Sequence, residues 1–134
     1  MSQENVDILL RAAEVFDAGD IDRYLADFIA PEIEWRTAAE DPDAGTHRGR
    51  DAFRRYIEQW MDSFDDLRAE PEDWIDVDDE HVFAWTHWSG RGRTSGVDAA
   101  WNLGIVYTIR DGRVVRGEEY FDRSEALKAV GLEE

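Results

Sequence analysis

The sequence contains no cysteine, which excludes disulfide-stapled folds and thiolate chemistry. Lysine is almost missing too: Lys128 is the single one, so arginine supplies the other 14 of the 15 basic residues. No apolar run approaches the ~20 residues that a membrane-spanning helix needs, and the opening "MSQENVDILL" has neither a basic region nor a cleavage-like site. We therefore expect a cytoplasmic protein with no membrane partner.

Acidic residues dominate what is present. The chain has 32 aspartates and glutamates and a formal net charge of −17. This charge repels nucleic acid, so no nucleic-acid partner is expected, and it keeps the surface solvated. The scarcity of lysine fits either a salt-rich cytoplasm or a GC-rich genome, and the sequence does not separate the two.

The first half of the chain has the three- and four-residue spacing of amphipathic helices. The segment "NVDILLRAAEVFDAG" predicts a helix that ends near Gly19, and Asp20 is placed to cap a second helix that ends before Pro31. A short strand "EIEWRT" and a polar loop "AAEDPDAGTHRG" follow. The clearest helix is predicted from Arg50 to Leu67.

The second half changes to the period of two that is typical of strands. Four strands are predicted at "EDWIDV", "HVFAWTHWSG", "VDAAWNLGIVYTI" and "RVVRGEEYF", and Asp111-Gly112 suits a tight hairpin between the last two. Helices followed by an antiparallel sheet predict a single α+β domain over residues 1–134, with the helices packed on one face.

Alternation along the strands sorts the side chains onto two faces. The set assigned to the helix side is Phe83, Trp85, His87, Trp101, Leu103, Ile105, Tyr107, Ile109, Val115, Gly117, Glu119 and Phe121. A carboxylate among aromatic rings is costly unless it is neutralised, paired or used in chemistry. Glu119 is therefore the main candidate for a buried acid or base, and His87 is its expected partner.

The opposite set is also apolar. It contains Val82, Trp88, Val106, Val114 and Tyr120. A monomer does not usually leave such a face in contact with water. This predicts a homodimer through the outer face of the sheet.

Several motifs together are similar to the SnoaL-like branch of the nuclear-transport-factor-2-like superfamily. They are "AGDIDRYLADF", a tryptophan-bearing strand after "PE", the helix that opens "GRDAF", and the closing "YFDRSEALKAVGL". The resemblance implies a conical, cystatin-like α+β barrel, with a curved antiparallel sheet wrapped around N-terminal helices and an internal apolar cavity. It leaves the activity open, because the superfamily contains cyclases, isomerases, hydrolases and proteins that only bind ligands.

The family's catalytic groups carry over only in part. The positions that match the ketosteroid isomerase residues fall near Ala12, at 35–37 and near Ile105, and none provides the needed group. The acid/base aspartate that cyclases have late in the sheet is matched by Asp122 or Glu119. Asp122 also has the spacing of an N-cap in "DRSE", and we favour the cap interpretation.

The expected cavity is lined by aromatic residues. The candidates for ligand contact are Trp35, Tyr56, Trp60, Trp85, Trp101 and Phe121. His87 is either a satisfied core histidine or a proton-transfer partner of Glu119. No metal and no cofactor are expected, because the three histidines lack a metal-ligand spacing.

Two functions follow from these residues. The favoured one is a pocket protein that binds a small apolar or polycyclic molecule. The alternative is an enzyme of the cyclase, isomerase or hydrolase type that uses Glu119 and His87 for acid/base chemistry.

Overall fold

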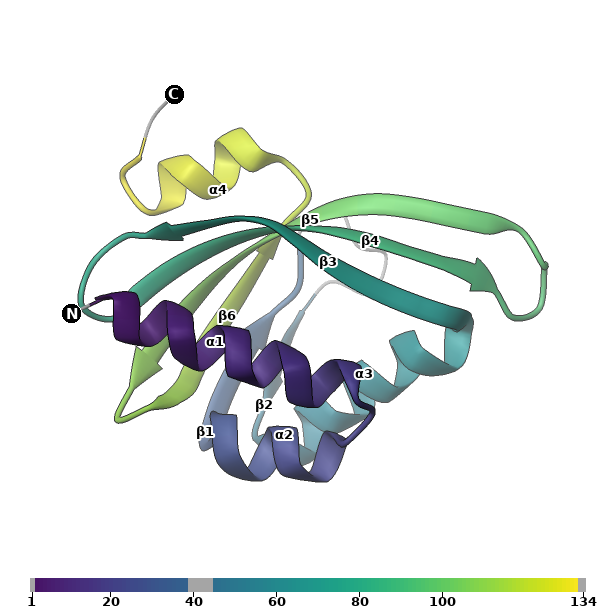
Figure 1. Cartoon of the computed structure of the whole chain (residues 1–134), viewed down its shortest axis with the longest axis horizontal. Coiled ribbons are helices and arrows are strands. Elements are labelled where there is room, and N and C mark those ends of the chain that lie inside the picture. The colour runs from purple at the N-terminus through teal and green to yellow at the C-terminus, as the bar shows by residue number, and fades with distance from the viewer. Residues whose placement is uncertain (1, 39–44, 133–134) are drawn as a thin grey trace.

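The computed structural model describes residues 2–38 and 45–132, within which four helices and six strands form one α+β unit (Figure 1). The middle of the predicted polar loop, residues 39–44, lies outside the described residues. In chain order the elements are α1 (Ser2–Asp17), α2 (Ile21–Phe28), β1 (Ile29–Arg36), β2 (Thr46–Arg48), α3 (Arg50–Ser63), β3 (Phe64–Asp76), β4 (His81–Gly92), β5 (Asp98–Arg110), β6 (Arg113–Tyr120) and α4 (Arg123–Ala129).

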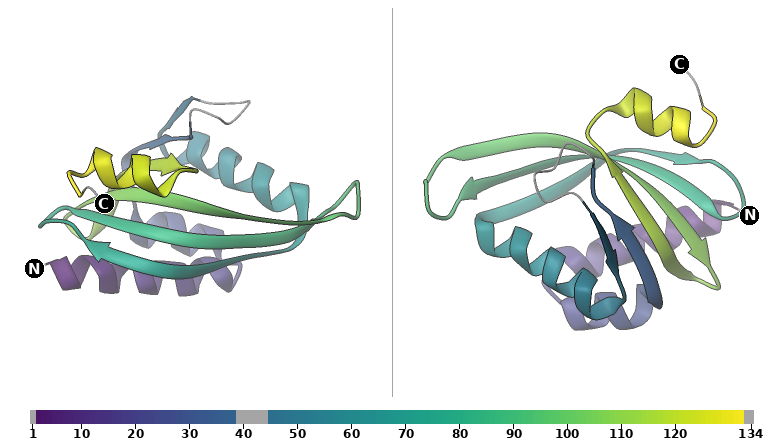
Figure 2. Two further views of the ribbon diagram at one scale, coloured as in Figure 1. Left: turned by 90° about the horizontal axis from the view of Figure 1, so that it is seen from above. Right: turned by 180° about the vertical axis from the view of Figure 1, so that it is seen from behind.

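The six strands form one curved sheet in the order β2-β1-β6-β5-β4-β3. Helices α1, α2 and α3 lie against one face and α4 covers part of the other, as Figures 1 and 2 show. The predicted α+β class is confirmed. Strands β2 and β3 are the two edges, so the sheet stays open and does not close into a barrel.

The expectation of a wholly antiparallel sheet is wrong at one place. Strand β1 pairs with β6 in parallel, with Trp35 opposite Gly117. The chain makes β2, α3 and three more strands before β6 returns beside β1, and a connection of that length permits parallel pairing.

The predicted turns and caps are largely confirmed. The first helix is followed by Gly19 at φ +83°, and the Asp20 side chain accepts a hydrogen bond from the Arg23 amide at 3.1 Å. Asp111 and Gly112 both have positive φ and join Arg110 to its partner Arg113 in a tight hairpin.

Helix α3 is shorter than the sequence predicts. It ends at Ser63, because the backbone of Phe64 is extended and starts β3, which pairs with the end of β4 at Gly92. The Phe64 ring then packs against Trp60 and Trp101. Tertiary packing thus ends a helix whose apolar spacing continues to Leu67.

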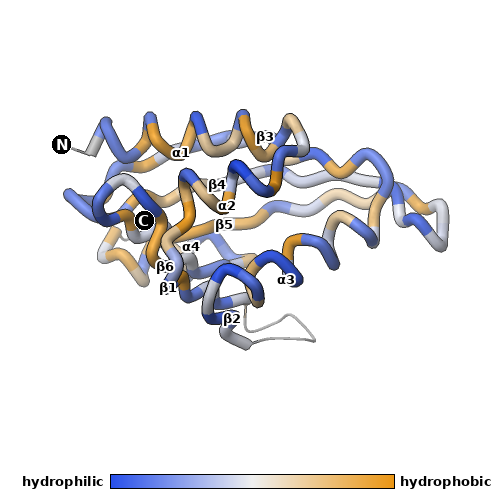
Figure 3. The backbone as a smooth tube through the Cα atoms, turned by 90° about the horizontal axis from the view of Figure 1, so that it is seen from below, coloured by the Kyte–Doolittle hydropathy of each residue, from blue (hydrophilic) through white to orange (hydrophobic). Residues whose placement is uncertain are grey.

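Two apolar cores lie on opposite faces of the sheet. The larger one lies between the sheet and helices α1 to α3, and Figure 3 shows polar and apolar residues alternating along α1 and α3. The smaller one lies under α4 and contains Phe83, Val106, Ala126 and Leu127. Across the described residues, no helix has both the length and the apolarity that crossing a bilayer requires.

The face assignment is right for β5 and wrong for β4. Leu103 and Ile105 belong to the larger core as predicted, but on β4 it is Val82 and Trp88 that face the helices. Phe83 points toward α4 instead. Antiparallel pairing puts Thr86 opposite Leu103, and paired residues point to the same side of a sheet, so the even-numbered residues of β4 share the face of Leu103.

The apolar residues that suggested a homodimer pack within the chain. Val82, Trp88 and Val114 pack in the larger core, while Val106 and Tyr120 pack in the core under α4. These residues are therefore covered within one chain. The homodimer stays a prediction, without the exposed apolar face that first suggested it.

Candidate functional site

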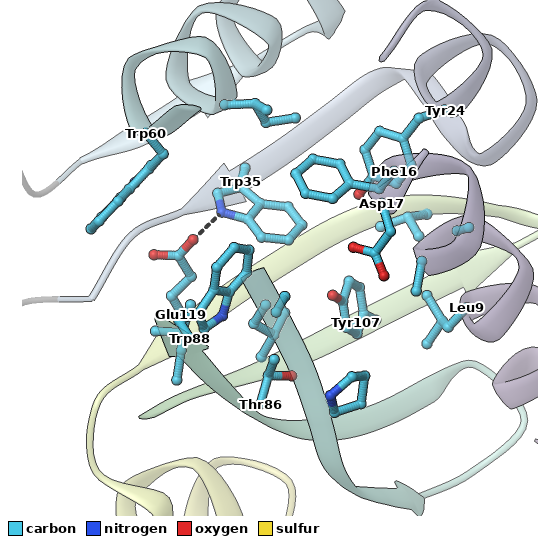
Figure 4. Close-up of a pocket in the computed structure, with 18 of the residues that line it drawn as sticks. Leu9, Phe16, Asp17, Tyr24, Trp35, Trp60, Thr86, Trp88, Tyr107 and Glu119 are labelled. Carbon is cyan, nitrogen blue, oxygen red and sulfur yellow. Dashed lines mark hydrogen bonds between the residues drawn. The ribbon is translucent and has the colours of Figure 1, made fainter. Parts of the chain in front are cut away.

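A cavity of ≈ 130 Å³ lies between the three N-terminal helices and the concave face of the sheet (Figure 4). Its walls are mostly apolar and aromatic. The predicted ligand-contact residues Trp35, Tyr56, Trp60, Trp101 and Phe121 all line it. Polar side chains gather at two places in this wall.

At one end of the cavity, Glu119 of β6 accepts hydrogen bonds from Trp35 and Tyr56. Its side chain is buried, with the residue 7% exposed. Trp35 Nε1 donates to Glu119 Oε2 at 2.7 Å, and the Tyr56 hydroxyl donates to both carboxylate oxygens at 2.7 and 2.9 Å. Carboxylate oxygens in an apolar wall can accept a hydrogen bond or a proton from a bound molecule.

Three elements place these groups. The parallel pairing of β1 and β6 sets Trp35 beside Gly117, two residues before Glu119 on the same face of β6. The indole lies directly on Gly117, where a β-carbon would overlap its Cζ3 and Cε3 atoms. Phe53 of α3 packs against the other side, with ring centroids 4.6 Å apart. The missing side chain at 117 therefore decides where the indole N–H points.

His47 supports the same end from β2. It pairs with Trp35 in the sheet, and its ring stacks on Tyr56 with centroids 4.6 Å apart. Sequence reasoning placed His47 in a loop, because a three-residue strand has too little alternation to be detected. Its ring restricts the orientation of the tyrosine that donates to Glu119.

At the other end of the cavity lie Asp17 of α1, Tyr24 of α2 and Tyr107 of β5. Burial raises the pKa of Tyr24, and partial burial raises the pKa of Asp17. The pKa of Tyr107 is raised well above its usual value, first by burial and then by repulsion from the Tyr24 phenolate that forms at high pH and from the Glu119 carboxylate. Both phenols are therefore neutral at pH 7.

This second polar end was not found in the sequence. Tyr24 fits the apolar stripe of its helix and Tyr107 fits the apolar face of its strand, so the position of each in the sequence is typical of a core residue. Asp17 carries no motif. The only signal was that two of the predicted core side chains carry a hydroxyl group.

The structure overturns the pairing of His87 with Glu119. Thr86 and Trp88 line the cavity, and His87 between them points to the opposite face of the sheet. There, His87 Nδ1 lies 2.9 Å from Asn102 Oδ1. Because the even-numbered residues of β4 face the cavity, the His87 imidazole lies on the opposite side of the sheet from Glu119. Direct proton transfer between the two therefore has no geometric basis.

Two more candidates lie outside the cavity. Trp85 packs in the core under α4, with the Arg123 guanidinium 5.7 Å from its ring centre, so its predicted ligand contact is wrong. Asp122 is the N-cap of α4 and accepts hydrogen bonds from the amides of Ser124 and Glu125 at 2.8 and 3.4 Å. The cap interpretation is confirmed, and a catalytic role for Asp122 stays a prediction without a cavity contact.

Metal binding finds no support in the part of the chain that the structure describes. In residues 2–38 and 45–132, no three histidine, aspartate or glutamate side chains form a group that could hold a metal ion. The polar groups that the described residues present to the cavity include carboxylates, hydroxyls and indole N–H groups.

Comparisons with known proteins agree with this architecture. The model of the SnoaL-like domain matches residues 9–117. No curated protein matches the chain in sequence. Many solved structures are similar to the chain.

Bal32a, from a soil-derived mobile gene cassette, superposes with a TM-score of 0.81 at 22% identity and covers 96% of this chain and 97% of its own. An NTF2-like protein from Burkholderia thailandensis has a TM-score of 0.76 at 26% identity, with 90% and 95% covered. TerC, co-crystallised with polyporic acid, has a TM-score of 0.75 at 20% identity, with 95% and 98% covered. These similarities show a shared fold over nearly the whole chain.

Proposed function

The chain belongs to the SnoaL-like family, and from this premise we propose that it binds a small, largely apolar molecule in the cavity, with Glu119 as the polar anchor. The observation that supports this most is the buried carboxylate that Trp35 and Tyr56 hold at the cavity wall. Burying a charge costs several kcal/mol, and a binding role explains why a carboxylate stands there. The polyporic acid complex of TerC is a precedent for a ligand in this fold.

The walls favour a flat ligand. Trp60, Trp88 and Trp101 lie together, with Trp101 5.5 Å from Trp60 and 6.4 Å from Trp88 between ring centroids. Aromatic rings gain about 0.5–1.5 kcal/mol from stacked or edge contacts with one another beyond the area they bury. The cavity volume of ≈ 130 Å³ is comparable to the roughly 150 Å³ of an engineered apolar cavity that accepts benzene. One or two fused rings are therefore the expected size.

Naphthalene and 2-naphthol test this proposal, with binding measured by quenching of tryptophan fluorescence and by calorimetry. We expect both to bind, and we expect 2-naphthol to bind more tightly because its hydroxyl donates to Glu119. In Glu119→Gln the affinity for 2-naphthol should fall about tenfold, since a hydrogen bond to a charged group contributes about 1.5–3 kcal/mol. The affinity for naphthalene should not change.

Glu118→Gln is the matched control. Glu118 is the preceding residue of β6, points to the other face and pairs with Arg36 and Arg116. Its substitution should leave both affinities as they are. If neither compound shows saturable binding to the folded protein, the proposal is wrong.

Acid/base catalysis by Glu119 is the second candidate. The observation that favours it is the fixed position of the carboxylate at the cavity wall, and it no longer includes His87. A catalytic Glu119 should accelerate exchange of the α-protons of 2-tetralone for deuterium, which proton NMR follows in D₂O. The expected acceleration over Glu119→Gln is about 100-fold, the lower range for a positioned general base. Equal exchange rates for the native protein and Glu119→Gln would contradict catalysis by Glu119 and leave ligand binding as the only proposed function.

A further inference from the structure

The hydroxyls of Tyr24 and Tyr107 are polar groups in the cavity wall that the anchor at Glu119 does not use. Both residues line the cavity. Among residues 2–38 and 45–132, neither hydroxyl makes a hydrogen bond to another protein group, in contrast to Tyr56 and Tyr120. Both side chains are only partly buried, and each hydroxyl keeps exposed surface, so both are available to a polar group of a bound molecule.

Asp17 belongs to the same end of the cavity. It comes from the last turn of α1 and stands at the rim, where its side chain is largely exposed. Figure 4 shows its carboxylate directed toward the same space as the oxygens of Tyr24 and Tyr107. Within the described part of the chain, no cation pairs with it. Three elements, α1, α2 and β5, thus bring two donors and one acceptor to one place.

Trp35 relates this place to Glu119. Its indole nitrogen donates to Glu119, while its ring meets the Tyr107 ring edge-on with centroids 5.9 Å apart. The two polar ends therefore lie on either side of one indole. A fused two-ring molecule has about the length of an indole, so it can present one polar group to each end.

We propose that Tyr24 and Tyr107, with Asp17 at the rim, form a second hydrogen-bonding subsite that receives a hydroxyl group at the far end of the ligand. This inference rests on the proposed function and specifies its ligand: a flat aromatic molecule of about two fused rings with a polar group at each end. The neutral tyrosine hydroxyls donate or accept, and the carboxylate of Asp17 accepts. A ligand hydroxyl satisfies both kinds of partner.

The test compares 2-naphthol with 2,6-dihydroxynaphthalene, which adds a hydroxyl at the opposite end of the same ring system. We expect the second hydroxyl to tighten binding about tenfold in the native protein, which corresponds to one hydrogen bond of about 1.4 kcal/mol. In Tyr107→Phe this gain should disappear, and in Tyr24→Phe it should shrink. The gain is the ratio of the two affinities measured in the same protein, so a general effect of either substitution on the cavity cancels.

Stability gives an independent readout. Because neither hydroxyl has a protein partner in the described residues, Tyr24→Phe and Tyr107→Phe should unfold at the native denaturant midpoint or above it. Tyr120→Phe is the control, because the Tyr120 hydroxyl donates to Glu118 and accepts from Arg36 on the other face of the sheet. It should lose some stability and keep the full gain from the second hydroxyl.

The outcomes separate the two proposals. If 2-naphthol binds but the second hydroxyl adds nothing, or if its gain survives in the Tyr24→Phe/Tyr107→Phe double variant, the second subsite is wrong and the Glu119 anchor stands. If neither naphthalene nor 2-naphthol binds, the cavity does not hold such ligands and both proposals fall. Loss of the gain in Tyr107→Phe alone supports the subsite.

Discussion

Gly117→Ala should lower the free energy of unfolding by about 3 kcal/mol and abolish the binding of 2-naphthol. The β-carbon would occupy the space of the Trp35 indole, which is buried and held on its other side by Phe53. Overpacking of this kind costs about 1–3 kcal/mol, and a large ring between two neighbours has little freedom to relax. Movement of the ring would also break the hydrogen bond from Trp35 to Glu119 and disturb the anchor. Chemical denaturation and fluorescence titration measure the two effects.

A double substitution separates overlap from any general effect of alanine at this position. Trp35→Leu removes the ring that the new methyl group would strike. If overlap is the cause, Gly117→Ala should cost much less stability in the Trp35→Leu background than in the native chain, a coupling that only contacting residues show. Gly117 does not have a positive φ, so no backbone strain is added. If the stability costs of Gly117→Ala and Trp35→Leu simply add in the double variant, overlap between the new methyl group and the indole is not the cause.

The strands β5 and β6 show what the sequence can predict. Their lengths, the hairpin at Asp111-Gly112 and the inward direction of Glu119 all follow from local patterns. The turn pairs Arg110 with Arg113 and Ile109 with Val114, but a one-residue register shift before Thr108 is what places Glu119, and not Glu118, opposite Ile105. The apolar alternation near the end of β6 predicted the inward carboxylate, and the register shift that puts it there has no signal in the turn.

Strand β4 shows where the same reasoning fails. Val82 and Phe83 are neighbours that point to opposite faces, yet both are 0% exposed, because the first packs under the N-terminal helices and the second under α4. A strand covered on both faces has no polar side to reveal its phase. Choosing the larger rings as the inner set reversed the phase, and this misplaced both His87 and Trp85.

The remaining parts of the site depend on contacts between distant segments. The hydrogen bond between Trp35 and Glu119 joins residues 84 positions apart, and it requires the parallel pairing of β1 with β6. The stacking of His47 on Tyr56 requires the three-residue strand β2. The pairing of β1 with β6 and the pairing of β1 with β2 are not set by a tight turn, because the strands of each pair are joined by longer connections. The family resemblance supplied the fold but not these side-chain contacts.

Glu119→Leu should lower the free energy of unfolding by about 2 kcal/mol, and the size of this loss measures how well the carboxylate is paired. Removing it leaves the Trp35 N–H and the Tyr56 O–H without their acceptor, and an unsatisfied buried donor costs about 1–3 kcal/mol. The leucine gains back part of this, because it avoids burying a charge. Glu119→Gln keeps a carbonyl oxygen for one donor and should lose only about 1 kcal/mol, within the usual net contribution of one hydrogen bond.

The combination with Tyr56→Phe decides how the loss arises. If the hydrogen bond between the two side chains contributes to it, Glu119→Leu and Tyr56→Phe should together cost less stability than the sum of their separate costs, because both remove the same hydrogen bond. Urea midpoints of the four proteins give the coupling free energy directly. A Glu119→Leu variant more stable than the native chain would contradict this account. It would mean that burying the charge costs more than its hydrogen bonds return, as happens for some buried ion pairs, and that Glu119 contributes to ligand binding and not to stability.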